Sequence, residues 1–98
     1  MEAANAVDGE GRAALWRASG AGDVAKVKAE LARGAGVNKA DTEFGATPLY
    51  IAAFNGHVDA LKALLVAGAD KTCKFQGFTA LDAARSNGHA AIVKLLFA

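Results

Sequence analysis

The chain repeats itself, and this repetition limits its fold more than any other feature. The segment Leu49–His57 (LYIAAFNGH) returns 32 residues later as Leu81–His89 (LDAARSNGH). A weaker copy lies upstream, where residues 15–35 match residues 49–69 at a shift of 34. Three copies of about 33 residues predict a stack of similar units, each of which buries its apolar face against its neighbours.

Each copy is predicted to form two short helices. In the second copy Thr47 suits the N-cap, and Pro48 suits the first helical position, where a missing N–H costs nothing. Gly56 can adopt the left-handed conformation that ends this helix. A second helix is predicted over about residues 58–67, and Gly68 follows it.

The third copy shows the same signals. Thr79 is its predicted N-cap, and Asp82 three residues later completes a weak capping box. The apolar side of its final helix is expected to consist of Ile92, Val93, Leu96 and Phe97. Helices of about eight to ten residues are marginally stable alone, so the pairs must pack together. An all-α stack is therefore predicted rather than a bundle of longer helices.

The composition fits a single small folded domain. The chain has 98 residues, of which 53% are apolar and 21% are charged, as in ordinary globular proteins. About a quarter of the residues are alanine and only 7% are aromatic. Closely packed helices, rather than large side chains, are therefore expected to build the core.

Charge and cysteine content exclude several classes of function. The formal net charge is only +1, so a nucleic-acid binder, which would carry a clear basic excess, is not predicted. A single cysteine excludes an internal disulfide and a cysteine-based zinc cluster. No stretch approaches the ~20 apolar residues of a membrane helix, and residues 1–11 lack the pattern of a signal peptide. We therefore expect an intracellular protein, cytoplasmic or nuclear, with no membrane insertion.

The second copy resembles a known family. Gly45–Ala53 (GATPLYIAA) followed by Asn55–His57 (NGH) closely resembles the ankyrin repeat, and Leu64–Asp70 (LLVAGAD) continues the pattern. The resemblance covers about residues 12–98. It implies an all-α ankyrin-repeat solenoid of stacked helix-turn-helix units with short hairpin-like loops. It also implies a non-enzymatic protein that binds others on a concave face made by the loop tips and the inner helices.

The resemblance implies a division of the chain into a tail and three units. Residues 1–11 are expected to form a flexible N-terminal tail ahead of a repeat domain over residues 12–98. Within this domain, repeat 1 is expected at about 12–44 as an N-terminal cap, repeat 2 at about 45–76, and repeat 3 at about 77–98 as a truncated copy.

The sequence also departs from the family pattern. The family's histidine after Thr-Pro-Leu is replaced by Trp16, Tyr50 and Asp82, so an altered capping network is expected. The loop over residues 36–49 is one residue longer than the family norm, and the loop over residues 70–81 is one shorter. These differences leave the geometry of the finger loops open.

No residues suggest a catalytic, cofactor or metal site. The chain has two histidines and one cysteine, and it shows no motif that places a nucleophile beside a base. The resemblance implies that His57 and His89 cap the second helices of their repeats, and a shared metal site is the less favoured alternative. Cys73 is expected to be a small loop residue rather than a redox switch. The glycines follow no phosphate-loop pattern.

The predicted partner-binding residues centre on phenylalanine. Four phenylalanines fall outside the core pattern of the repeat, at positions where the resembled family makes contacts, and exposed aromatic side chains are typical interaction anchors. We favour contact for Phe54 and Phe78, whereas for Phe44 and Phe75 folding back into their loops is an equal alternative. The full predicted set is Thr42, Glu43, Phe44, Phe54, Asn55, Lys74, Phe75, Gln76, Phe78 and Ser86.

The two ends of the stack are predicted to differ. The basic residues of the first copy are interpreted as a solvated end cap, with contact to an acidic partner as the less favoured alternative. They are Arg12, Arg17, Lys26, Lys28 and Arg33. The final helix, over residues 90–97, keeps the apolar pattern of an internal repeat, and the side that carries Leu95 is expected to be uncovered. Either a longer protein continues there, or another chain or a second copy covers this face.

These observations predict a non-enzymatic protein–protein interaction module, an adaptor or scaffold, with no cofactor. The sequence carries no feature that names its protein partner. Two alternatives stay open, a structural subunit packed permanently in a larger assembly and an ankyrin fragment of a longer multidomain protein.

Overall fold

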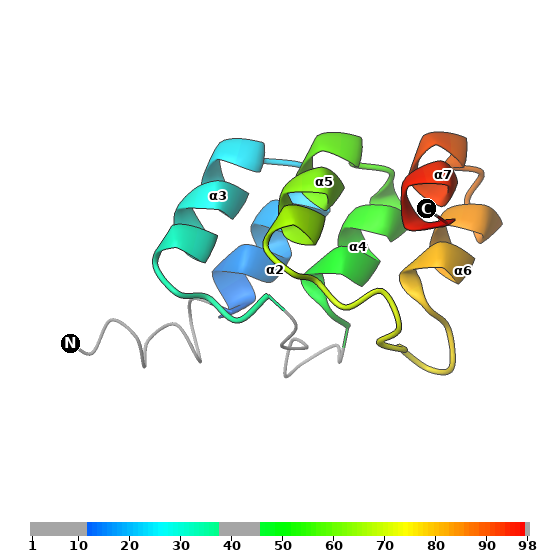
Figure 1. Ribbon diagram of the computed structural model, residues 1–98, viewed down its shortest axis with the longest axis horizontal. Coiled ribbons are helices and arrows are strands. Elements are labelled where there is room, and N and C mark those ends of the chain that lie inside the picture. The colour runs from blue at the N-terminus through cyan, green and yellow to red at the C-terminus, as the bar shows by residue number, and fades with distance from the viewer. Residues whose placement is uncertain (1–11, 38–45, 98) are drawn as a thin grey trace.

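The computed structural model describes residues 12–37 and 46–97 of the chain. Its described part contains six helices arranged as three helix-turn-helix pairs (Figure 1). The helices are α2 (Arg12–Ala21), α3 (Val24–Ala32), α4 (Pro48–Asn55), α5 (Val58–Val66), α6 (Ala80–Ser86) and α7 (Ala90–Phe97). Their lengths of seven to ten residues agree with the short helices predicted from the repeat.

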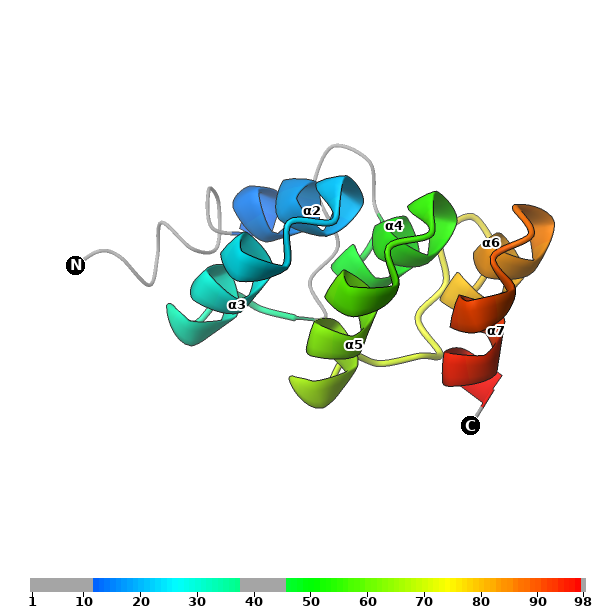
Figure 2. The ribbon, with the colours of Figure 1, turned by 90° about the horizontal axis from the view of Figure 1, so that it is seen from above.

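The helix pairs stack side by side in two layers. The first helices, α2, α4 and α6, form one layer, and the second helices, α3, α5 and α7, form the other (Figure 2). The first helices pack against one another more extensively than the second helices do. Each pair contacts mainly the next pair, which confirms the predicted all-α solenoid.

Small and aliphatic side chains fill the core between the layers. Leu15, Leu49, Leu61, Leu64 and Ile92 are almost completely buried. Several alanines of the first helices are buried as well, namely Ala52, Ala53, Ala83 and Ala84. Because alanine adds little bulk, these helices can approach closely, as the alanine content predicts.

The helix ends follow the predicted capping chemistry. The Oγ1 atom of Thr47 accepts a 3.2 Å hydrogen bond from the backbone N–H of Tyr50, and Pro48 occupies the first helical position. Gly56 ends α4 with φ of 80°, in the left-handed region. At α6 the predicted capping box is complete, because Thr79 and Asp82 exchange side-chain to backbone hydrogen bonds of 3.2 and 3.0 Å.

The loop between α5 and α6 ends in a tight hairpin. The backbone groups of Phe75 and Phe78 exchange two hydrogen bonds of 2.8 and 3.0 Å. Between them, Gln76 and Gly77 have φ values of 53° and 86°, which is the pattern of a two-residue type I′ turn. This finger is therefore the hairpin-like loop that the sequence predicts.

Two predictions for the last helix are wrong. Phe97, expected on the apolar side of α7, is 72% exposed, whereas Leu95, expected to be uncovered, is half-buried against the core. On α3 the equivalent residue, Leu31, shares a pocket with residues of α5 in the following unit, whereas no described helix follows α7. The guanidinium carbon of Arg85 lies 6.0 Å from the centre of the Phe97 ring.

Candidate functional site

An aromatic cluster lies on the first-helix layer. The ring of Tyr50, on α4, stacks on Phe54 one turn later, with ring centres 6.2 Å apart and an interplanar angle of 27°. The ring of Phe75, from the hairpin, lies 5.1 Å from Tyr50 at an angle of 60°. The helix and the hairpin therefore place three rings together, and both spacings are in the range of favourable aromatic pairs.

A pocket of about 220 Å³ lies beside this cluster, and we call it the aromatic pocket. It is lined by Trp16, Ala46, Tyr50, Ile51, Phe54 and Phe75. These residues come from α2, from α4 and its preceding loop, and from the hairpin. Apart from the Trp16 indole nitrogen and the Tyr50 hydroxyl, the lining side chains offer only apolar surface.

Two phenylalanines expose large apolar surface next to the pocket. Phe54 is 45% exposed on α4, and Phe78 is 55% exposed at the base of the hairpin. Phe75 is half-buried because its ring packs on Tyr50, so its side chain folds back and still lines the pocket. Together these three side chains make the surface around the aromatic pocket apolar.

The polar residues around the cluster have defined charge states near neutral pH. The pKa of Asp82 lies below its ordinary value, mainly because the backbone N–H of Thr79 donates to this carboxylate and then because the Thr79 hydroxyl does. Partial burial raises the pKa of the Tyr50 phenol, and the nearby negative charge of Asp82 adds to this effect. Tyr50 therefore keeps its proton and Asp82 stays ionised, while Lys74 and Arg85 place positive charges near that carboxylate.

One comparison with known proteins decides the family. The family model described as ankyrin repeats, in three copies, matches residues 15–98. The chain belongs to the ankyrin repeat family. Ankyrin repeats are generally protein–protein interaction modules and are typically non-enzymatic. No curated protein matches the chain. None of the helices in the described ranges is long and apolar enough to cross a membrane.

The histidine rings contact the preceding repeat. His57 is the N-cap of α5, the position that the resemblance implies, but its side chain makes no capping hydrogen bond. The ring lies instead against Gly22 of the preceding unit, where an added Cβ would meet it. In the next unit, Nε2 of His89 lies 3.1 Å from the carbonyl oxygen of Phe54. Both rings therefore join successive ankyrin repeats, because each is directed backward along the stack rather than onto its own helix.

The remaining predicted contact residues lie in different settings. Lys74, Gln76 and Ser86 are exposed, with Gln76 at the tip of the hairpin turn. The amide of Asn55 is exposed but donates a 2.9 Å hydrogen bond to the carbonyl oxygen of Gly20. The predicted contact residues Thr42, Glu43 and Phe44 lie outside the described residues, as does the expected tail over residues 1–11.

The sequence prediction missed four of the six residues that line the pocket. They are Trp16, Ala46, Tyr50 and Ile51, and none of them was among the predicted contact residues. One signal was present, because Trp16, Tyr50 and Asp82 occupy the same position in the three repeats and depart from the ankyrin pattern there. At this position the side chain therefore changes from aromatic in the first two repeats to acidic in the third.

Within residues 12–37 and 46–97, no group of three or more His, Cys, Asp or Glu side chains is placed to hold a metal ion. Cys73 lies in the finger loop, where partial burial raises the pKa of its thiol and the nearby charge of Asp70 adds to this rise. Both effects disfavour the reactive thiolate.

Proposed function

We propose that this chain is a non-enzymatic adaptor that binds a protein partner through the aromatic pocket and the two exposed phenylalanines beside it. This surface lies on the first helices and the hairpin, which correspond to the concave face of ankyrin repeat proteins. The observation that carries the proposal is that Phe54 exposes large apolar surface in a pocket lined almost entirely by apolar groups, while the exposed Phe78 is hydrogen-bonded through its backbone to Phe75, another lining residue.

The physical argument concerns how such a surface gains affinity. An aromatic side chain buries about 150–250 Å² on binding, and a few such anchors dominate most protein interfaces. Here the anchors lie on a helix capped by Thr47 and on a hairpin closed by two backbone hydrogen bonds. A partner therefore binds a surface that is already ordered, which avoids much of the entropy cost of association.

A second candidate is a structural subunit in a larger assembly, and one observation favours it. The ring of Phe97, on α7, is 72% exposed at the far end of the stack from α2. In such a subunit this ring would be covered permanently by another chain. In an adaptor it would stay accessible while the aromatic pocket is occupied.

Affinity capture with matched variants tests the proposal. The intact chain is compared with a Phe54→Ser, Phe78→Ser variant, and with Ala29→Ser as the control. Ala29 is exposed but lies on α3, in the other layer. We expect a partner that is retained by the intact chain and by Ala29→Ser and is lost by the still-folded double variant. Retention by the double variant together with loss by Phe97→Ser would favour the assembly subunit instead.

A further inference from the structure

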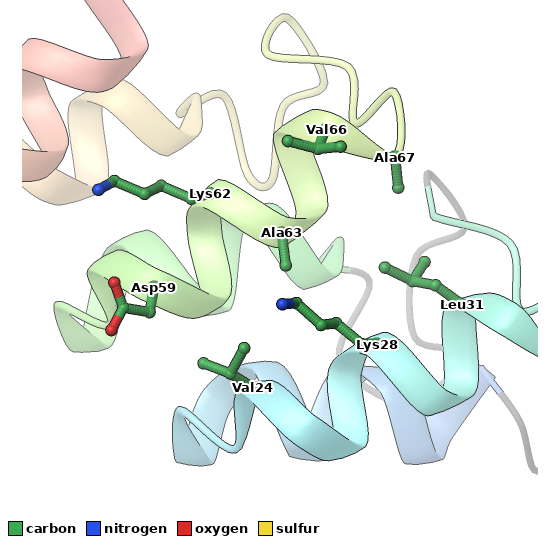
Figure 3. Close-up of a pocket in the computed structure, with 8 residues that line it drawn as sticks. All are labelled: Val24, Lys28, Leu31, Asp59, Lys62, Ala63, Val66 and Ala67. Carbon is green, nitrogen blue, oxygen red and sulfur yellow. The ribbon is translucent and has the colours of Figure 1, made fainter.

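A second groove lies on the opposite layer of the stack, between α3 and α5 (Figure 3). Its volume is about 650 Å³, and it is open to solvent along the two helices. The groove is lined by Val24, Lys28, Leu31, Asp59, Lys62, Ala63, Val66 and Ala67. None of these residues belongs to the aromatic pocket, so the two surfaces are separate.

A small side chain lies at the centre of the groove. Ala63 is on the side of α5 that faces α3, and it points toward the Lys28 side chain (Figure 3). The residue 32 positions later, Leu95, occupies the same place on α7 and is half-buried against the core. At this position α5 therefore carries a much smaller side chain than α7, and the groove lies beside it.

The charges around the groove are unequal. Lys28 reaches from α3 into the groove below Ala63, and Lys62 extends from α5 in a direction away from α3 (Figure 3). Both side chains are exposed, and Asp59 near the start of α5 is the single carboxylate among the lining residues. The lining is therefore mostly apolar, with one ammonium group inside the groove and a net positive charge.

We propose that this groove docks an amphipathic helix of a protein partner, with its apolar face between α3 and α5 and its carboxylates against Lys28 and Lys62. An open trough between two neighbouring helices suits a third helix, whose residues at i, i+3, i+4 and i+7 would enter it. The excess of lysine selects acidic flanks on that helix and disfavours basic ones. This binding is additional to the adaptor function and does not depend on it.

Two synthetic peptides of about 15 residues provide the probe. Both carry leucine at i, i+3, i+4 and i+7, and they differ only in having glutamate or lysine at the flanking positions. Each is titrated into the ¹⁵N-labelled full chain and followed by NMR. We expect saturable shifts around Leu31 and Ala63 with the glutamate peptide, and about tenfold weaker binding of the lysine peptide.

Filling the groove tests its role without disturbing the fold. Ala63→Leu introduces the side chain that the next repeat already carries at Leu95, so the variant is expected to fold. It should weaken binding of the glutamate peptide at least about tenfold. The matched control is Ala29→Leu, because Ala29 is the equivalent residue on α3, is exposed and does not line the groove. It should bind as the intact chain does.

Charge reversal separates this proposal from its competitors. Lys28→Glu, Lys62→Glu should transfer the preference from the glutamate peptide to the lysine peptide, and Phe54→Ser, Phe78→Ser should leave both affinities unchanged. Three results would each overturn the proposal: no saturable shift up to about 1 mM peptide, shifts confined to the aromatic pocket, or glutamate-peptide binding that survives Ala63→Leu. Binding to phosphatidylserine vesicles that Ala63→Leu leaves intact, without peptide binding, would assign the lysines to a membrane surface.

Discussion

The side-chain amide of Asn87 donates a 2.8 Å hydrogen bond to the main-chain carbonyl oxygen of Phe54, one repeat earlier. Asn55 makes the equivalent bond of 2.9 Å to Gly20. Both carbonyl groups lie in the last turn of a first helix, where a carbonyl oxygen has no partner within the helix. The asparagine that begins each Asn-Gly-His segment therefore joins its repeat to the preceding one.

Removing one of these bonds should destabilise the stack measurably. Asn87→Ala is expected to lower the free energy of unfolding by about 1 kcal/mol, the typical net value of one hydrogen bond. Urea unfolding followed by circular dichroism measures the change. The neighbouring exposed residue provides the control, since Ser86→Ala should change stability by no more than about 0.5 kcal/mol. Equal effects of the two substitutions would contradict a linking role for Asn87.

Two glycines with similar backbone conformations should differ in how much their substitution by alanine lowers stability. Gly56 and Gly68 have φ values of 80° and 96°, so alanine is strained at both positions. A Cβ at Gly56 would also lie 2.7 Å from the His89 ring, whereas nothing lies within 4 Å of one at Gly68. We expect Gly68→Ala to cost about 1 kcal/mol, and Gly56→Ala to cost clearly more in the same unfolding assay.

The extra cost at Gly56 has a specific origin, which a double variant tests. If it comes from the His89 ring, Gly56→Ala in a His89→Ala background should cost about as much as Gly68→Ala alone. The coupling between the two substitutions is then about 1 kcal/mol or more, as expected for residues in contact. Strict additivity of the two single changes would show that the ring does not limit this position.

The capping box of α6 should make stability depend on pH. The pKa of Asp82 is lowered in the folded protein, chiefly by the backbone hydrogen bond from Thr79, so folding favours the ionised carboxylate. The stabilisation from ionised Asp82 is complete above the pKa of this residue in the unfolded chain, about 3.9. It is lost as the pH falls through the lower pKa of the folded protein. Asp82→Asn should therefore flatten the decrease in unfolding free energy between about pH 5 and pH 2. Thr79→Val, which keeps the backbone donor, should give an intermediate slope; an unchanged slope in Asp82→Asn would refute this account.

The hairpin turn contains a residue that is not suited to its conformation. Gln76 has φ of 53° at the first central position of the type I′ turn, where asparagine is preferred. Gln76→Asn should raise the unfolding free energy by about 0.5–1 kcal/mol, because asparagine adopts the left-handed region more easily. Thermal unfolding measures this change, and a lower melting temperature would show that the glutamine side chain makes a stabilising contact.

Local signals in the sequence predicted most of the fold. Thr47 and Thr79 with their following residues gave the starts of the first helices, and Gly56 gave an end, because capping depends on residues only a few positions apart. The repeat itself predicted the stack. The contacts of the His57 and His89 rings were not predicted, since they depend on the glycine and carbonyl groups of the preceding repeat.

The surfaces were harder to predict than the helices. Phe54 and Phe78 could be selected as exposed anchors because they break the repeat pattern. Trp16 and Ile51 lie on separate helices and line one pocket only after α2 packs on α4. The residues that line the α3–α5 groove likewise come from two helices, and they form one surface only after α3 packs on α5.

The aromatic pocket contains the protein's only tryptophan, which provides the most direct test of the proposed function. The chain is labelled with 5-fluorotryptophan, and its single ¹⁹F NMR signal is followed while the partner obtained by affinity capture is added. We predict a saturable shift of the Trp16 signal, which is absent when the same partner is added to Phe54→Ser, Phe78→Ser. A partner that binds by calorimetry but leaves the Trp16 signal unchanged would contradict the proposal that this pocket is the binding site.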